Sequence, residues 1–336
     1  MPAPTRRQLL GGLTVAATAA ACLPESKSQG SGTVPPAVTD DDSPLEPIVA
    51  NEDFYRVSIN SYVPDAAWLE AWTLTLADDD GNEVVLTLDE LRALGGTEQE
   101  RTLSCIGSGS GITSGNAMWT ARRLDEIFAD VGFAPDKRLQ WLRFYAGDGF
   151  YTDVPRSDLA NGLALAWGMN GVDLPNDHGA PLRALVPGRY GMKNPKWIER
   201  IEVVETFAEG FWESRGWSQD ADYLVASWFK VPGYGAAVTI EGTWVKGLAF
   251  AGEREISKVE VSTDDGTTWA NAEITYLGGA GVWTLWRFHF VPLVAGSYTL
   301  RVRATTADGE VQQQLEDYDA DLDGLEAWDQ LLLQVE

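Results

Sequence analysis

The C-terminal third of the sequence is built from short runs in which apolar and polar residues alternate. The runs Val259–Ser262, Trp283–Phe290 and Tyr298–Val302 show this pattern, with turn residues between them. Because successive side chains of a strand point to opposite faces, short alternating runs at regular spacing are typical of a β-sandwich. The pattern begins near Tyr223, and we expect a sandwich domain over residues 208–336.

The preceding part of the chain, residues 48–207, mixes strand-like and helix-like segments. The expected elements are strands at Ala71–Leu76, Trp141–Phe144 and Ile198–Val204 and short amphipathic helices at Leu88–Leu91 and Leu124–Phe128. The predicted fold class is therefore α+β, with a mixed α/β domain first and the β-sandwich second.

Composition supports two folded domains and excludes one class of partner. The 336 residues are 44% hydrophobic and include 14 tryptophans, which is enough to build two cores. The net charge of −25 argues against nucleic-acid binding, which needs a basic surface. The acidic residues are spread along the whole chain, so solubility explains them better than docking of a basic redox partner.

The N-terminus resembles an export signal that ends at Cys22. Arg6–Leu10 is followed by the alanine-rich apolar run Gly11–Ala21, which is too short to span a bilayer. The paired arginines resemble a twin-arginine signal, the route for proteins exported already folded. Ala19–Cys22 resembles a lipoprotein cleavage box, so Cys22 is a candidate lipid anchor, although an ordinary signal with an incidental cysteine also fits. Residues 23–47 are rich in Ser, Pro, Asp and Gly and predict a disordered linker.

Cys105 is the single cysteine that remains once this signal is removed. It lies in the apolar run Thr102–Ile106, just before a stretch rich in glycine and serine. A lone cysteine forms no intrachain disulfide. It packs as a small hydrophobe, acts as a nucleophile or binds a soft metal, and the rest of the chain favours the metal.

A series of ordered motifs resembles the sulfite oxidase family of molybdopterin-dependent oxidoreductases. The motifs follow the family's order and spacing along nearly all of the mature chain, and they are Asn51–Arg56, Thr102–Cys105, Met169–Gly171, His178–Arg183, Val186–Gly188, Tyr190–Trp197, Glu213–Trp217 and Val259–Trp269. The resemblance implies a bacterial, exported enzyme with a molybdopterin domain. It also implies that the sandwich is an immunoglobulin-like dimerisation domain, so that the protein is a homodimer.

The resemblance assigns a Mo-molybdopterin cofactor and most of its binding residues. Cys105 takes the role of the thiolate that ligates molybdenum, in keeping with the soft character of sulfur. Arg183, Lys193 and Lys196 are expected to hold the cofactor phosphate, because cations near glycine-bearing loops suit that group. His178 is expected to donate a hydrogen bond to the pterin.

Four further positions complete the expected cofactor site. Asn51, Phe54 and Tyr55 match positions that wall the cofactor in the family, and Asn194 lies within the same motif as Lys193. Asp148–Tyr151 fits the mouth of the pocket and a surface turn equally well.

The residues after Cys105 depart from the family and leave the substrate open. Sulfite oxidases follow the cysteine with an Ala-Gly-Asn-Arg-Arg pattern, whereas Ile106–Gly111 carries no charge and has Ser108 where the asparagine and arginine would stand. A neutral sulfur– or nitrogen–oxygen compound is therefore expected to react better than sulfite. Four arginines are candidates to replace the missing one, and the sequence does not place them: Arg56, Arg122, Arg123 and Arg215.

The chain has no Cys-x-x-Cys-His haem motif, so its electrons are expected to pass through a separate carrier such as a c-type cytochrome in the periplasm.

Two other interpretations of the function stay open. In one, a lipoprotein with a degenerate cofactor site serves as a binding or assembly module. In the other, a cell-surface sandwich binds a ligand, and the acidic run Asp317–Gly324 is a candidate calcium loop that has Gln330 in place of the final glutamate.

Overall fold

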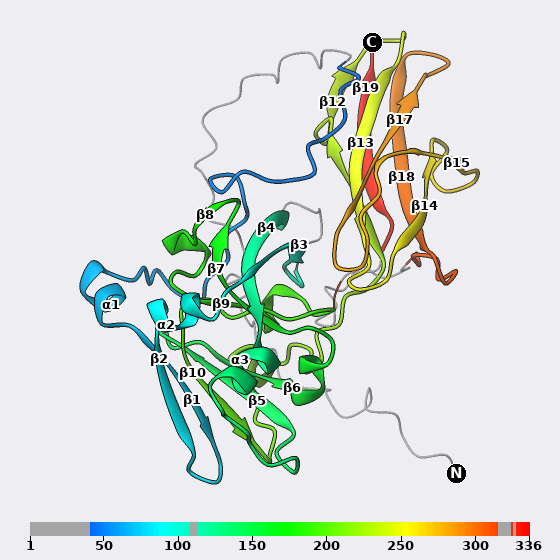
Figure 1. Ribbon diagram of the computed structural model, residues 1–336. Coiled ribbons are helices and arrows are strands. Elements are labelled where there is room, and N and C mark those ends of the chain that lie inside the picture. The colour runs from blue at the N-terminus through cyan, green and yellow to red at the C-terminus, as the bar shows by residue number, and fades with distance from the viewer. Residues whose placement is uncertain (1–40, 108–112, 315–323, 325–326) are drawn as a thin grey trace, which may run out of the picture.

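The computed structural model describes residues 41–107, 113–314, 324 and 327–336 (Figure 1). Several predictions lie outside these residues: the export signal, the lipid anchor at Cys22, most of the linker, Ser108 and the candidate calcium loop apart from Gly324.

The first domain contains short helices and two sheets. Its elements are α1 (Ala66–Ala71), β1 (Thr73–Asp78), β2 (Glu83–Thr87), α2 (Leu88–Ala93), β3 (Thr97–Ser104), β4 (Ser114–Arg123), α3 (Leu124–Asp130), β5 (Trp141–Ala146), β6 (Tyr151–Pro155), β7 (Ala164–Met169), β8 (Val172–Asp173), β9 (Arg183–Leu185) and β10 (Ile198–Val204). One sheet has the order β2-β1-β10-β5-β6, and the other has the order β3-β4-β7-β8 with β9 also paired to β7.

Local sequence explains where the helices begin. Thr87 and Glu90 form a reciprocal capping box at the start of α2, which fixes that helix at the predicted place. Asp65 caps α1 by accepting a hydrogen bond from the backbone N–H of Trp68 at 2.8 Å. Because α1 continues to Ala71, the strand predicted from that residue begins only at Thr73, and that boundary was wrong.

The second domain is a β-sandwich, as predicted. Its strands are β11 (Ala226–Val231), β12 (Ala236–Val238), β13 (Thr243–Phe250), β14 (Ile256–Ser262), β15 (Ala270–Asn271), β16 (Glu273–Tyr276), β17 (Thr284–Phe290), β18 (Gly296–Thr306) and β19 (Asp329–Val335). The two sheets have the orders β11-β13-β17-β16 and β12-β19-β18-β14-β15. The alternating residues that predicted these strands supply the core, with Val259, Val261, Leu300 and Val302 all buried.

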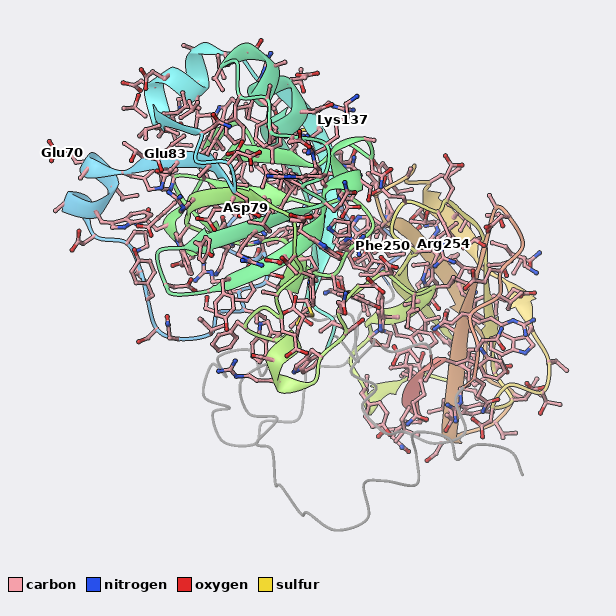
Figure 2. All side chains as sticks on the ribbon, turned by 90° about the horizontal axis from the view of Figure 1, so that it is seen from below. Glu70, Asp79, Glu83, Lys137, Phe250 and Arg254 are labelled. Atoms are coloured by element: carbon pink, nitrogen blue, oxygen red, sulfur yellow. The ribbon has the colours of Figure 1, made fainter. Side chains whose placement is uncertain are left out.

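A shared apolar cluster joins the two domains. Tyr223, Trp228 and Phe250 of the second domain pack with Tyr190 and Trp212 of the cofactor half. Figure 2 shows Phe250 and Arg254 at this junction. The interface is therefore part of the core of the protein, and the predicted boundary at residue 208 falls just before Trp212, which packs within it.

The end of the predicted disordered linker is held in place. We call residues 41–49 the N-terminal strap. The backbone oxygen of Pro47 accepts hydrogen bonds from Asn116 of the first domain and from Trp283 of the second, each at 3.0 Å. Lys246 donates to the backbone oxygen of Ser43 at 2.6 Å. The prediction of disorder was thus wrong for residues 41–47, because these hydrogen bonds bind the strap to both domains.

Within the part of the chain that the structure describes, no helix has the length and apolar character needed to cross a bilayer.

Candidate active site

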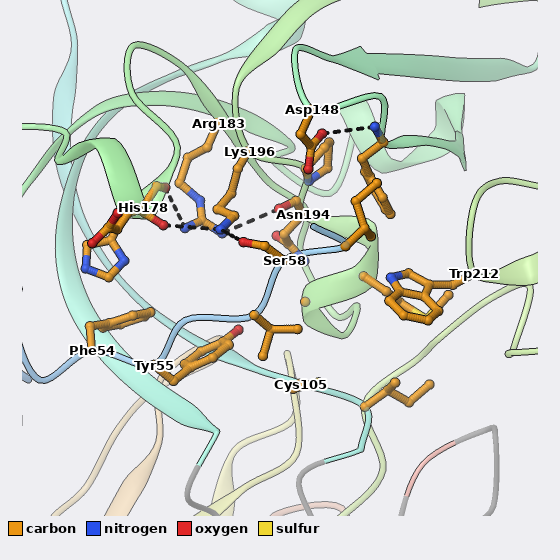
Figure 3. A pocket seen from close by; sticks show the side chains of 18 of the residues that line it. Phe54, Tyr55, Ser58, Cys105, Asp148, His178, Arg183, Asn194, Lys196 and Trp212 are labelled. Atoms are coloured by element: carbon orange, nitrogen blue, oxygen red, sulfur yellow. Dashed lines mark hydrogen bonds between the residues drawn. The ribbon is translucent and has the colours of Figure 1, made fainter. Parts of the chain in front are cut away.

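A pocket of about 780 Å³, its open mouth included, lies where the cofactor motifs converge (Figure 3). Its walls come from Phe54, Tyr55, Val57, Ser58, Ile59, Cys105, Ile106, Asp148, Phe150, Asp177, His178, Arg183, Gly191, Met192, Asn194, Pro195, Lys196, Trp212 and Trp217.

Cys105 follows directly after β3 and lines this pocket. Its backbone N–H bonds to the backbone oxygen of Thr113 at 2.9 Å, which continues the β3–β4 pairing one residue further. The side chain is 7% exposed, so a thiolate here is shielded from bulk water. This placement agrees with a role as a ligand.

Arg183, the first residue of β9, is a buried cation at the pocket wall. It donates to the backbone oxygens of His178 at 3.0 Å and of Asn194 at 3.4 Å, and its Nε has no hydrogen-bond partner. No carboxylate of the described residues forms an ion pair with it. Burial lowers the pKa of Arg183 to about 10. A buried cation in this state favours an incoming anion.

Lys196 reaches the same part of the pocket. Its Nζ donates to the hydroxyl of Ser58 at 2.8 Å and to the backbone oxygen of Asp177 at 3.2 Å. Burial, with repulsion from Arg183 as a smaller cause, lowers the pKa of Lys196 to about 7. Figure 3 shows Arg183, Lys196 and Ser58 grouped together, while Trp212 lies on the other side of the view.

Gly179 allows the two cations to approach each other. Its φ is +113°, and a Cβ atom at this position would lie 3.0 Å from the Cβ of Lys196 and 3.1 Å from that of Arg183. A side chain at this position would push Arg183 and Lys196 apart. The positive φ also disfavours any residue other than glycine. The glycine is thus part of the cation site.

His178 is buried and neutral. Its Nε2 lies 2.6 Å from the backbone oxygen of Asn51. Burial is the main cause that lowers the pKa of His178 to about 4. Because a carbonyl oxygen only accepts, Nε2 carries the proton and Nδ1 is an acceptor. The sequence predicted that His178 donates to the pterin. In the arrangement seen here the donor is already used and the ring offers an acceptor, so the hydrogen bond to the pterin stays a prediction.

The aromatic pair predicted to wall the cofactor is placed as expected. The Phe54 and Tyr55 rings stack at 5.2 Å, and Phe54 also packs edge-on against His178 at 5.4 Å. Both residues line the pocket. Burial raises the pKa of Tyr55 far above its ordinary value, so its hydroxyl stays protonated.

Asn51 and Asn194 mainly support the site. Asn51 is outside the pocket wall and holds His178 through its backbone oxygen. Asn194 lines the pocket, and its side chain accepts from the backbone N–H of Val186 at 2.7 Å and donates to two carbonyls, those of Arg189 and Tyr190. Asn194 therefore fixes the loop that carries the cofactor motif.

Lys193 does not reach the pocket. It is fully buried and forms an ion pair with Glu213, with further hydrogen bonds to Thr152 and to the backbone oxygen of Asp153. Its expected contact with the phosphate is therefore wrong, because its charge is already neutralised within the protein.

None of the four candidate arginines is itself part of the pocket wall. Arg122 and Arg123 pair with Asp130 and Asp125 beside α3. Arg56 forms an exposed ion pair with Asp177 at 3.0 Å, and Arg215 stacks over Phe211. Arg56 comes nearest to the pocket, because its partner Asp177 lines the wall, so which of the four replaces the missing arginine stays open.

The sequence analysis did not assign Trp212 and Trp217, which line the pocket together with Phe150. The available signal was the density of aromatic residues over 211–217, directly after the cofactor motifs. Asp148 also lines the pocket and accepts from the backbone N–H of Phe150 at 2.9 Å. Burial raises the pKa of Asp148. The sequence left Asp148–Tyr151 as either the pocket mouth or a surface turn, and the structure supports the pocket mouth.

Comparison with known families defines the class of protein. The model described as "Oxidoreductase molybdopterin binding domain" matches residues 60–212, and the model described as "Mo-co oxidoreductase dimerisation domain" matches residues 221–318. The chain therefore carries a molybdopterin-binding domain followed by a dimerisation domain of the kind found in molybdopterin oxidoreductases.

Individual relatives identify the family. The mitochondrial sulfite oxidase of Drosophila melanogaster is 28% identical over 252 residues, which cover 60% of this chain and 44% of that protein. The NADPH nitrate reductase of Mycosarcoma maydis is 32% identical over 151 residues, which cover 35% of this chain and 15% of that protein. This chain belongs to the sulfite oxidase family. It spans about half the length of the sulfite oxidases that it matches.

A solved structure shows the same fold over nearly the whole chain. The sulfane dehydrogenase SoxCD from Paracoccus pantotrophus superposes with a TM-score of 0.70 at 17% identity, covering 94% of this chain and 87% of that one.

The residues present fit the Mo-molybdopterin cofactor of this family. Arg183 has a buried, unused N–H, and Gly179 leaves room for Lys196 beside it. Cys105 opens into the same pocket. The described residues contain no group of three or more His, Cys, Asp or Glu side chains able to hold a metal.

Proposed function

We propose that this protein is an exported, periplasmic molybdopterin enzyme that transfers two electrons to or from a small neutral sulfur– or nitrogen–oxygen compound. One observation carries the substrate class. Of the described residues that line the pocket, the only arginine and lysine are Arg183 and Lys196, which are grouped where they suit a phosphate, while the remaining wall includes Phe150, Trp212 and Trp217.

The chain's own residues have separate tasks in this proposal. When bound, Mo-molybdopterin supplies two-electron redox chemistry. Cys105 holds the metal through its thiolate, and Arg183 and Lys196 hold the phosphate by charge-assisted hydrogen bonds. Trp212 and Trp217 exclude water from the reacting side of the pocket, which strengthens the electrostatic interactions there.

The pocket walls favour a neutral substrate over a dianion. A sulfite ion without a cation partner lacks a charge-assisted contact worth about 1.5–3 kcal/mol. Asp148 adds repulsion whenever it is ionised. Reduction of a sulfoxide consumes two electrons and two protons and yields the sulfide and water. The electrons come from a separate carrier such as a c-type cytochrome, and the protons come from solvent.

Replacing Cys105 tests the cofactor assignment. Cys105→Ser removes the soft ligand, so we expect molybdenum content and thiolate-to-metal absorption to be lost while the sandwich stays folded by circular dichroism. Elemental analysis of the wild-type protein is the matched measurement. A degenerate site used as a binding module predicts no molybdenum in either protein, and full activity of the serine variant would reject the proposed role of Cys105.

Steady-state kinetics test the substrate class. With an artificial electron carrier, kcat/KM for a panel of sulfoxides and N-oxides is expected to exceed that for sulfite by at least about tenfold, the factor of one lost charged contact. A kcat/KM for sulfite above every neutral compound would overturn the proposal and make Arg56 and Arg215 the next residues to replace.

The remaining proposals concern assembly and location. The match of residues 221–318 to a dimerisation domain supports a homodimer, which light scattering at micromolar concentration will test.

The signal-like residues before Cys22 support export of the folded enzyme, with lipid attached at Cys22. Cell fractionation and mass spectrometry of the mature N-terminus test location and lipidation, and a full-length cytoplasmic chain would reject both.

A further inference from the structure

Strand β3, which leads to Cys105, lies at the edge of its sheet. The strand order β3-β4-β7-β8 leaves one side of β3 without a neighbouring strand. Alternate backbone N–H groups of an edge strand point away from the sheet and need other partners. The N–H of Cys105 points toward β4 and bonds to Thr113, so the outward groups nearest to it belong to Ser104 and Thr102.

The second domain accepts both of these hydrogen bonds. The N–H of Thr102 donates to the backbone oxygen of Gly281 at 2.9 Å. The N–H of Ser104 donates to the phenolic oxygen of Tyr223 at 3.0 Å. Thr102 is 3% exposed and Ser104 is not exposed at all, so water cannot replace these partners. The last part of the strand before Cys105 is thus held by its own sheet on one side and by the second domain on the other.

Tyr223 is itself rigidly held. Its backbone N–H donates to the oxygen of Gly188 at 2.9 Å. Its ring packs edge-on against Tyr190 at 4.5 Å and against Phe250 at 4.7 Å. Gly252 adjoins it so closely that a Cβ atom there would lie 2.9 Å from the Cβ of Tyr223. The hydroxyl therefore presents a fixed acceptor to the residue that precedes Cys105.

We propose that Tyr223 is a positioning residue for Cys105, so that the second domain sets the place of the thiolate in addition to its role in dimerisation. The inference rests on the proposed role of Cys105 as the molybdenum ligand. Loss of the Tyr223 hydroxyl leaves the Ser104 N–H buried without an acceptor, and the strand end shifts to relieve this. The shift is passed to Cys105 because the two residues are adjacent in the chain.

A second tyrosine provides a matched control. The hydroxyl of Tyr276, also in the second domain, bonds to both carboxylate oxygens of Glu100 at 2.8 Å. Glu100 lies on the same strand β3, farther from Cys105. Tyr276→Phe therefore weakens the contact between β3 and the second domain without touching the end of the strand.

The first measurement needs no cofactor. In a chain with Cys22→Ala, Cys105 is the only thiol, so the rate of its alkylation by iodoacetamide in the apoprotein reports on its surroundings. We expect Tyr223→Phe to change this rate by about fivefold, the factor that corresponds to one neutral hydrogen bond. Tyr276→Phe is expected to stay within about twofold of the parent, although both variants lower the melting temperature. Equal changes in alkylation rate in the two variants would show that Tyr223 only stabilises the domain interface and does not position Cys105.

The second measurement uses the loaded enzyme. We expect Tyr223→Phe to shift the thiolate-to-metal absorption and to lower kcat with KM unchanged, whereas Tyr276→Phe keeps the parent spectrum. If the parent shows no such absorption, the role of Cys105 fails. If the parent shows it and Tyr223→Phe leaves it unchanged, only the positioning role fails. Should Tyr223→Phe not fold, Phe250→Leu loosens the packing of the Tyr223 ring and keeps its hydroxyl, and the same shift is expected in smaller degree.

Discussion

Two buried cations ten residues apart, in neighbouring motifs, show how similar side chains take different roles. Arg183 lines the pocket and donates only to backbone oxygens, with its Nε unused. Lys193 lies behind the pocket wall in an ion pair with Glu213. Desolvation lowers the pKa of both groups, but only Lys193 has a carboxylate that opposes this effect.

The difference shows what distinguishes a ligand-binding cation from a structural one. Burying a charge is costly unless an opposite charge or sufficient hydrogen bonds compensate for it. For Lys193 the compensation is built into the chain. For Arg183 it is incomplete in the protein alone, so an anion such as the cofactor phosphate gains by binding there.

The largest effect is expected from Lys193→Met. It leaves Glu213 buried without its partner, and breaking such a pair typically costs about 3–5 kcal/mol of unfolding free energy. Urea denaturation of the apoprotein measures this cost. The double variant Lys193→Met with Glu213→Leu removes both charges and is expected to recover much of the loss. A single variant as stable as the parent would show that the pair is not the structural element described here.

A smaller and different effect is expected from Arg183→Met. The apoprotein keeps or gains stability, because a buried charge that is only partly compensated is removed. Cofactor binding weakens by about 1.5–3 kcal/mol for the lost charged hydrogen bonds, roughly 10- to 150-fold. Pterin content after purification and the melting temperature of the apoprotein report on these separately. A large loss of apoprotein stability with normal pterin content would reverse the comparison between Arg183 and Lys193.

The smallest change in ligand affinity concerns the pH dependence of Lys196. Its pKa of about 7 lies below the ordinary value of 10.5, so between these values the unfolded chain binds a proton that the folded apoprotein does not. The contribution of Lys196 to the unfolding free energy of the apoprotein is therefore lowest below pH 7, and it rises as the pH increases toward 10.5. The affinity for inorganic phosphate changes in the opposite sense, because it falls about tenfold as Lys196 loses its proton. With phosphate bound, this loss occurs at a pH above 7, because the anion stabilises the charged form of Lys196.

Lys196→Met serves as the control for this prediction. Because phosphate itself titrates near neutral pH, the informative quantity is the difference between the two proteins in affinity measured by calorimetry. Parallel pH profiles for the parent and the variant would exclude Lys196 from the anion site.

Much of the fold followed from local patterns. Alternation predicted the sandwich strands because one face of each is buried in a single core, and the apolar spacing at Leu88 and Leu124 predicted α2 and α3. The boundary at Ala71 failed because the helix that begins after the Asp65 cap continues through Ala71, so the alternating strand starts only after it.

The candidate site was predictable only in part, for a physical reason. Cys105, Arg183 and Lys196 lie in the pocket as the motifs indicated. The fate of Lys193 depended on Glu213, 20 positions away, and nothing in either motif signals that they meet. The proton on His178 was likewise decided by a carbonyl 127 positions earlier. Charge compensation and tautomers are properties of packed neighbours, so a single sequence does not reveal them.

The N-terminal strap has a consequence for the order in which the molecule is completed during synthesis. Its partners Lys246 and Trp283 follow Ser43 and Pro47 by 203 and 236 residues. A ribosome releases the strap and the first domain well before these partners exist, and contacts of such long range form slowly. Until the sandwich has been made, the nascent first domain therefore presents the bare edge of β3, an aggregation-prone surface, to its surroundings.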